Sequence, residues 1–590
     1  ERSGKRLKVL EGELYDDELV DVFPQVCSSR IWIVQGVRRC ENLMYLAELY
    51  STIAYLLGLP YPEEELKDSW EKILFLSFHD IITGCGVDEI YEEVKDIFQD
   101  LERDLGRIIK RALSHIARKI GTDGEAVVVF NPLAQPQKNW VEAKLQFLPG
   151  FREEPSVEDS QTLYTERDAR GDVREAKIGF FAQTPPLGYK VYKIEWGKKR
   201  GDGIKFDGEK VITPFYEAWV DKSGILMVKK GDKLIRGNEI IIEDEIGDLY
   251  YHKTRFQDLI KSESGGGFEY GSFKPKSIRF EKGNLMSKII FENEYYCLTW
   301  PYRLKKRFPP IIYKYKVIDI EKEVIFYRDL ERIDFITRIK NRYPCIRLRV
   351  KFDTGMERKE YVRETQFGVI SEPTEFVRKR EEAKPLGIPN FLSWFDYEDG
   401  EWGICFMNRG LPACEIKGES VYITLLRSVS GLSADGIAGP LVPTPDALEL
   451  RDYTYEYSIE IHEKDWREAK IYKKAQEYHH LPVPVQANSK GELPKELSFI
   501  EINPDNLILS CLKKAEKGED IILRFFETKG EKTKAEIKSF FHIRRAWITN
   551  LLEEEEKEIE VKDNKIELDV NPFEIITVKM EIGEGVKGNI

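Results

Sequence analysis

The feature that most constrains the fold is a change in the spacing of apolar residues near Glu125. Before it, apolar residues recur every three or four positions, which places them on one face of a helix. This spacing predicts helices over 31–58, 64–78 and 87–120. From "EAVVVFNP" onward, short β-rich runs are broken by Gly, Pro, Asp and Asn, which is typical of an all-β protein. The sequence therefore predicts a three-helix bundle followed by β-sandwiches.

Within the β region, the clearest strands are predicted over 288–292, 323–328, 346–352 and 565–570. A single later helix is predicted over 463–479. The following stretch, "HLPVPVQANSKGELP", resembles a linker, and the remainder is long enough for a final small β domain.

Composition excludes several classes of partner. The chain has 590 residues and a formal net charge of −13, which argues against nucleic acid and anionic membranes as partners. No apolar run approaches the ~20 residues of a membrane span. Eight cysteines without a C-x-x-C motif, and no Asn-X-Ser/Thr acceptor, favour a reducing, cytoplasmic setting. The chain begins Glu-Arg-Ser and not with Met, so a targeting segment could precede it.

The stretch "LFLSFHDIITGCGVDEIYEEV" holds the best candidate for chemistry, His79 beside Asp80. A structural interpretation is a helix-terminal His that meets backbone carbonyls, with Asp80 as a loop acid. The apolar flanks instead predict a buried pair, and a buried charge needs a partner or a metal. An imidazole is a good zinc ligand, and a neighbouring carboxylate can bind a substrate hydroxyl. Gly84 and Gly86 let the backbone turn sharply there.

Other motifs give weaker indications of function. "GEGVKG" at 583–588 matches G-x-G-x-x-G but has no following helix, so no nucleotide site is predicted. The glycines at 265–267 are interpreted as a flexible loop, and the charged run 551–560 as a solvated hairpin. His479 and His480 are predicted to be surface histidines and not a metal site, because adjacent residues at a helix end rarely point the same way.

Taken in order, several segments resemble one family. "FHDIITGCGVDEIYEEV" resembles the FHD segment of glycoside hydrolase family 38, the retaining α-mannosidases. "CSSRIWIVQGVRRCENLMYLAE", "VVVFNPLAQPQKNWVEA", "PPLGYKVY" and "IIEDEIGDLYYH" resemble further family segments in family order. So do "RIDFITRI", "CFMNRGLPACEI", "ITLLRSVSGLS" and "NPFEIITVKM", and the likeness covers essentially the whole chain. It is nearest to the bacterial and archaeal branch.

This resemblance implies a domain order. A catalytic barrel would come first, with its tail at 1–20, and the helical middle domain would follow at 21–121. A large β super-sandwich of the galactose-mutarotase-like type would span 122–485, and a small C-terminal β-sandwich 495–590.

The resemblance also implies a site. Family members hold a zinc ion with the His and Asp of an H-x-D motif, a second Asp that is the nucleophile, and the FHD His. His79 would then be the fourth metal ligand, and Asp80 would bind sugar hydroxyls. Tyr250 in "GDLY" and Arg427 in "LLRS" match substrate-binding residues. A strand-end Tyr and a surface Arg remain equal alternatives for these two.

The chain departs from the family in one respect: it contains no H-x-D motif. The nucleophile and the acid/base residue are therefore expected in a catalytic barrel outside this sequence. The chain is interpreted as the C-terminal portion of a zinc-dependent α-mannosidase, inactive by itself. A non-catalytic carbohydrate-binding or scaffold subunit of a split mannosidase is the alternative, and a structural β protein with a decayed site is another. The mannoside cut, the choice of zinc over cobalt, and homo-oligomer formation stay open.

Overall fold

The computed structural model describes residues 23, 26–197, 203–222, 224–253, 271–299, 313–374, 390–433, 436 and 438–583. The three predicted helices are confirmed as α1 (Trp32–Leu56), α2 (Glu63–Leu76) and α4 (Asp88–Lys119). Between α2 and α4 lies α3 (His79–Ile82), a single turn too short to show a helical period. A 3₁₀ turn, η1 (Val26–Ser28), precedes α1, and η2 (Pro445–Leu448) lies in the β region.

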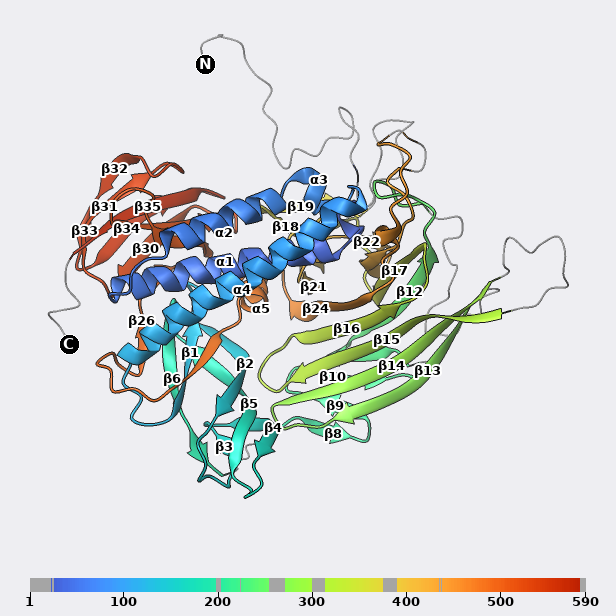
Figure 1. Cartoon of the computed structure of the whole chain (residues 1–590), viewed down its shortest axis with the longest axis horizontal. Coiled ribbons are helices and arrows are strands. Elements are labelled where there is room, and N and C mark those ends of the chain that lie inside the picture. Colours follow the sequence, from blue (N-terminus) through green and yellow to red (C-terminus); the bar gives the residue numbers. More distant parts are fainter. Residues whose placement is uncertain are drawn as a thin grey trace, which may run out of the picture.

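The long helices pack side by side because their apolar stripes face one another. The buried stripe of α4 includes Leu101, Leu105 and Ile108, at helical spacing. Gly36 of α1 lets the helices approach closely, since a Cβ there would lie 2.6 Å from the Phe98 ring of α4. The bundle lies along one edge of the molecule, above the sheets in Figure 1. No helix in the described ranges is long and apolar enough to cross a bilayer.

The largest part of the molecule is a sandwich of two antiparallel sheets with an aromatic and aliphatic core between them. The eight-stranded sheet runs in the order β22 (Cys414–Lys417), β23 (Ser420–Arg427), β17 (Ile346–Asp353), β12 (Lys233–Asp244), β11 (Leu226–Lys230), β10 (Glu217–Val220), β9 (Lys210–Ile212), β8 (Lys205–Asp207). The nine-stranded sheet runs β13 (Gly271–Glu281), β14 (Met286–Thr299), β15 (Tyr313–Tyr327), β16 (Ile333–Asn341), β24 (Asp452–Glu463), β21 (Trp402–Asn408), β20 (Trp394–Glu398), β18 (Glu360–Thr365), β19 (Gly368–Pro373).

Smaller sheets join this sandwich to the helices. One has the order β25 (Val483–Ala487), β1 (Ala126–Asn131), β6 (Gly188–Lys193), β26 (Glu496–Ser498). Beside it lie β2 (Gln137–Gln146), β5 (Val173–Thr184), β4 (Ser160–Arg167), and the short pair β3 (Pro155–Ser156), β7 (Glu195–Trp196). Every residue of β1 is buried because Val128 and Phe130 face the helices while Val127 and Val129 face the second sheet.

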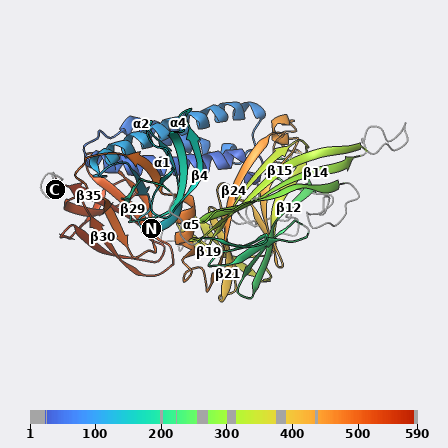
Figure 2. The same cartoon turned by 90° about the horizontal axis from the view of Figure 1, so that it is seen from below.

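The predicted small C-terminal β-sandwich consists of two sheets. The first is β27 (Ile500–Asn503), β30 (Thr533–Ser539), β34 (Lys565–Val570), β33 (Val561–Lys562). The second is β28 (Leu507–Lys514), β29 (Ile521–Glu527), β35 (Ile575–Ile582), β31 (Ile543–Thr549), β32 (Glu555–Ile559). These sheets share a hydrophobic core with α1 and α4. Figure 2 shows them at the opposite end of the molecule from the large sandwich.

The helical-then-β fold class is confirmed, but two local predictions are wrong. The helix predicted over 463–479 is only α5 (Ile471–His479), because β24 continues to Glu463. The segment interpreted as a linker contains β25, which pairs antiparallel with β1. Its apolar residues sit too close to prolines for a strand to be read from spacing alone.

The remaining motif predictions have mixed outcomes. The run 551–560 does turn back as a hairpin, since β32 pairs with β31, and Leu551 and Leu552 are exposed. The glycines at 265–267, and all of "GEGVKG" after Gly583, lie outside the described residues.

Candidate functional site

His79 and Asp80 open α3, on the surface of the bundle. Their side chains are 78% and 63% exposed, and His79 Nε2 lies 3.6 Å from Asp80 Oδ1. The predicted burial of this pair is therefore wrong. In a single helical turn only one side can face inward, and Ile81 takes it, at 5% exposure. The pair is left facing outward beside Phe78, which is 49% exposed.

The backbone beneath this pair is held firmly. Thr83 Oγ1 donates to the carbonyl of His79 at 2.5 Å, and the Tyr91 hydroxyl donates to the carbonyl of Asp80 at 3.2 Å. Gly84 has φ +75°, and a Cβ there would lie 2.6 Å from the Ser29 carbonyl oxygen, so this turn requires glycine. The sharp turn expected at Gly84 is thus present.

Arg30 ties this turn to the start of the bundle. It is 1% exposed, pairs with Asp88 at 2.5 Å and donates from Nε to the Gly84 carbonyl at 3.1 Å. Its guanidinium also lies 4.2 Å from the centre of the Tyr91 ring. The surface pair therefore stands on a rigid base.

Tyr250 comes to the same place from the large sandwich. It belongs to the loop that follows β12, and its ring centre lies 5.2 Å from that of Phe23. Burial, together with the neighbouring Cys85 thiol and the Asp80 carboxylate, raises the pKa of Tyr250 to about 12. The structure thus brings Tyr250 close to the turn that carries His79 and Asp80.

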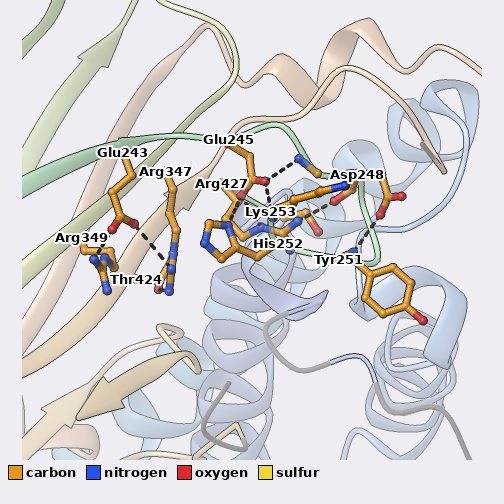
Figure 3. Close-up of polar contacts among 12 residues, drawn as sticks. Glu243, Glu245, Asp248, Tyr251, His252, Lys253, Arg347, Arg349, Thr424 and Arg427 are labelled. Carbon is orange, nitrogen blue, oxygen red and sulfur yellow. Dashed lines mark hydrogen bonds and ion pairs between the residues drawn. The ribbon is translucent and has the colours of Figure 1, made fainter. Parts of the chain in front are cut away.

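Arg427, at the end of β23, is completely buried, so the surface-Arg alternative is wrong. Its Nε donates to Glu245 Oε2 at 3.1 Å, and its Nη2 donates to the Asp248 carbonyl at 2.5 Å. Figure 3 shows these contacts. Arg427 therefore contacts Glu245 and the loop that carries Tyr250, and a direct contact with substrate stays a prediction.

Glu245 is the centre of this arrangement. Its Oε2 also accepts a hydrogen bond from His252 Nδ1 at 2.6 Å, and its Oε1 accepts the amides of Gly247 and Lys253 (Figure 3). Burial alone would raise the pKa of this carboxyl, but Arg427, His252 and the Lys253 amide outweigh burial and lower the pKa to about 2. Burial lowers the pKa of His252 to about 4, so at neutral pH a neutral imidazole faces a carboxylate.

A second set of buried charges adjoins the first along the sheet. Glu243 contacts Arg349 and lies 3.5 Å from Arg347, while Arg349 pairs with Glu415 at 2.7 Å. Burial, with the nearby Arg349, lowers the pKa of Arg347 to about 10. Sequence reasoning singled out none of these residues. A signal was present: Glu243 lies opposite Arg347 across the β12–β17 pair, and Arg349 lies two residues further along β17 on the same face.

The described residues do not complete a metal site. They contain no group of three or more His, Cys, Asp or Glu side chains suited to hold an ion. His79 and Asp80 could supply one imidazole and one carboxylate, and any further ligands would have to come from elsewhere.

His479 and His480 are part-buried and not surface residues, contrary to prediction. His480 Nδ1 lies 2.7 Å from Asn42 Oδ1, and its ring packs 4.7 Å from that of Tyr45. Burial and the nearby Arg409 lower the pKa of His479 to about 3 and of His480 to about 4. The end of α5 packs against the helical bundle, which a short amphipathic pattern did not reveal.

The fold and this site define a class of protein: a helical domain joined to β-sandwiches, with polar residues gathered where the two meet. Family comparisons are more specific. The profile "Alpha mannosidase middle domain" matches residues 22–116, and "Glycosyl hydrolases family 38 C-terminal domain" matches 260–434. The "Glycosyl hydrolases family 38 C-terminal beta sandwich domain" matches 506–578. The chain belongs to glycoside hydrolase family 38.

Individual relatives agree. A putative mannosylglycerate hydrolase of Halalkalibacterium halodurans is 21% identical over 98% of this chain and 70% of its own length. Alpha-mannosidase G of Dictyostelium discoideum is 22% identical over 88% of this chain and 48% of its own length. The chain thus spans 70% of the length of the first relative and about half, 48%, of the second.

A solved structure shares the fold. The crystal structure of an alpha-mannosidase from Enterococcus faecalis V583 superposes with a TM-score of 0.79 at 17% identity. The match covers 96% of this chain and 69% of that one.

Proposed function

We propose that this chain is the C-terminal portion of a retaining, zinc-dependent α-mannosidase that hydrolyses terminal α-linked mannose. One observation supports this above the others: in a chain that matches three family 38 domains, Tyr250 of the sandwich packs in one cluster with Cys85, three residues after the helical turn that carries His79 and Asp80. Residues far apart in sequence thus form one surface of the kind a sugar could contact.

The proposed roles follow from exposure and chemistry. His79 presents an accessible imidazole and would supply one ligand to a zinc ion, which when bound would hold and polarise sugar hydroxyls. Asp80 presents a carboxylate that can accept hydrogen bonds from two hydroxyls. The Tyr250 phenol, protonated at neutral pH, can donate one. The nucleophile and the acid/base carboxylate would belong to the barrel, about 5 Å apart as retention requires.

The barrel needs a surface on which to dock, and the end of α2 with the residues that follow it offers one. Leu74, Phe75 and Phe78 are 66%, 55% and 49% exposed, next to His79. Contiguous exposed apolar side chains mark interaction surfaces. We propose that the family's catalytic barrel covers this apolar face, which would bring its carboxylates to the exposed pair. Binding of a purified barrel to a Leu74→Lys variant tests this.

The proposed roles are tested in an enzyme that combines this chain with its barrel. His79→Ala should lower activity on an aryl α-mannoside at least about 100-fold and weaken zinc binding, by loss of a ligand. Asp80→Asn should keep the metal and raise KM, because an amide accepts hydrogen bonds less strongly than a carboxylate. Metal analysis and steady-state kinetics measure both effects.

The matched control is His542→Ala, which removes another exposed histidine, on the small C-terminal sandwich. It should change neither metal content nor rate. Stoichiometric zinc at wild-type affinity in His79→Ala would refute the ligand role. Sugar binding without hydrolysis in the combined enzyme would favour the carbohydrate-binding or scaffold alternative.

A further inference from the structure

We propose that Glu245 is a positioning residue, whose buried carboxylate fixes loop 246–253 and thereby sets Tyr250 against the turn after α3. The kinetic consequence rests on the proposed function, whereas the structural consequence does not. Glu245 is 1% exposed and lies directly after β12, at the point where the chain leaves the sheet.

The first step is that Glu245 closes the loop. Its Oε1 accepts the amide of Gly247 at 2.8 Å and the amide of Lys253 at 3.1 Å, so one oxygen ties both ends together. The backbone crosses at the same place, because the Ile246 amide donates to the Lys253 carbonyl at 2.8 Å. A Cβ on Gly247 would lie 1.9 Å from the Tyr251 carbonyl oxygen, so the turn has no room for a side chain there.

The second step is that contacts made through Arg427 and Asp248 connect Glu245 to Tyr250. Arg427, held by Glu245, donates to the Asp248 carbonyl at 2.5 Å. The Asp248 carboxylate in turn accepts the amides of Tyr250 and Tyr251 at 2.9 and 2.8 Å. A continuous series of contacts therefore runs from Glu245 to the backbone of Tyr250.

The third step links the loop to the helical bundle. The Ser29 hydroxyl shares its proton between the Val26 carbonyl at 2.7 Å and the Leu249 carbonyl at 3.0 Å, and Leu249 is fully buried. Tyr250 therefore follows a residue that is anchored to the segment before α1. As a result, the tyrosine packs beside Cys85 in the turn after α3.

Charge explains why a carboxylate is needed at position 245. Arg427 is buried, and a buried guanidinium without a counter-charge is costly. His252, neutral at ordinary pH, can donate its Nδ1 proton but brings no negative charge. A glutamine would keep the size of the side chain but would leave Arg427 uncompensated and would turn an NH₂ group toward hydrogen-bond donors.

The test compares Glu245→Gln with Glu243→Gln by hydrogen exchange in the chain itself. Glu243 is the matched control, because it is also buried and paired with arginine, but its partners, Arg347 and Arg349, lie on β17 and not in loop 246–253. Glu245→Gln should speed exchange of amides in 246–253 by about 10- to 100-fold. Glu243→Gln should speed exchange in β12 and β17 and leave the loop unchanged.

Two outcomes would overturn the proposal: no acceleration in Glu245→Gln, or equal acceleration of the loop in both variants. If Glu245→Gln does not fold, Glu245→Asp serves instead. It keeps the charge facing Arg427 and withdraws the carboxylate by one carbon, so loop-specific acceleration of about 10-fold is expected.

A double-mutant cycle in the barrel-containing enzyme tests whether Glu245 acts through the tyrosine. Glu245→Gln should raise KM for an aryl α-mannoside about 10-fold with a smaller change in kcat, and Tyr250→Phe should do likewise. The double variant should be no worse than Tyr250→Phe alone, because the two effects share one contact. Additive effects would refute this route. A wild-type enzyme inactive on mannosides would refute the proposed function and leave the exchange result standing.

Discussion

Two of the His–carboxylate pairs of the molecule differ in nearly every physical respect. His79 and Asp80 lie on the helical bundle, 3.6 Å apart and mostly exposed. His252 and Glu245 lie at the end of a sandwich strand, 2.6 Å apart, with the carboxylate completely buried. Beside the first pair are exposed apolar side chains, and beside the second are Arg427 and a row of paired charges.

This difference indicates that the two pairs have different roles. The exposed pair has unused hydrogen-bonding capacity and costs little to leave in water, so it is available for a metal or a sugar. The buried pair has its capacity filled by backbone amides and Arg427, so it serves the geometry of the loop. Variants of the two pairs should therefore separate stability from function.

The largest effect is expected for Arg427→Met. It leaves Glu245 buried without its cation, and breaking a buried ion pair in this way costs about 3–5 kcal/mol. Chemical denaturation should show this loss in the free energy of unfolding. Asp80→Ala, which removes an exposed carboxylate, should change that energy by less than about 0.5 kcal/mol. Equal losses in the two variants would abolish the distinction between the pairs.

A smaller effect is expected from pH through His252. Its pKa is lowered from 6.5 to about 4 in the folded protein, chiefly by burial. Between these values the unfolded chain binds a proton that the folded chain does not, so stability falls as pH drops from about 6.5 to about 4. A shift of this size corresponds to about 3 kcal/mol.

His252→Gln should flatten the stability curve in that window, as measured by unfolding at a series of pH values. Glu245 acts lower: its pKa is depressed from 4.5 to about 2, so its contribution is lost only as pH falls through that range. His480, whose pKa is also lowered to about 4, should still make the stability of the His252→Gln variant fall somewhat in this window. An unchanged slope in His252→Gln would mean that this histidine is not held neutral by the fold.

The sequence predicted the helices and the fold class because long amphipathic patterns are averaged over many residues. Prediction from the sequence failed where only one or two residues determine burial or secondary structure. The apolar flanks of His79 predicted burial, but a single helical turn buries Ile81 and exposes its predecessors. The strand at Val483–Ala487 was hidden by its prolines.

The site was predicted only in part, and for a related reason. His79 and Asp80 were singled out by their apolar flanks, and Tyr250 and Arg427 through family resemblance; the structure packs Tyr250 in one cluster with Cys85, which follows the turn that carries the first two. Glu245 was missed because a lone acid near a strand end has no local signature. Its importance comes from Arg427, 182 positions away in sequence, and no spacing rule connects residues so far apart.

The smallest effect on stability is expected for Leu74→Lys, on the apolar face beside the exposed pair. Leu74 is 66% exposed, so the change should alter the free energy of unfolding by less than about 0.5 kcal/mol. It should nevertheless weaken binding of a purified catalytic barrel at least about 10-fold, because a desolvated ammonium in an apolar contact is costly. Leu148→Lys, the same substitution at a leucine that is 82% exposed on the loop after β2, is the control for the added charge alone. Isothermal titration with each variant measures both affinities. If Leu74→Lys binds the barrel as tightly as wild type, the apolar face is not the docking surface, and the exposed pair loses its proposed partner.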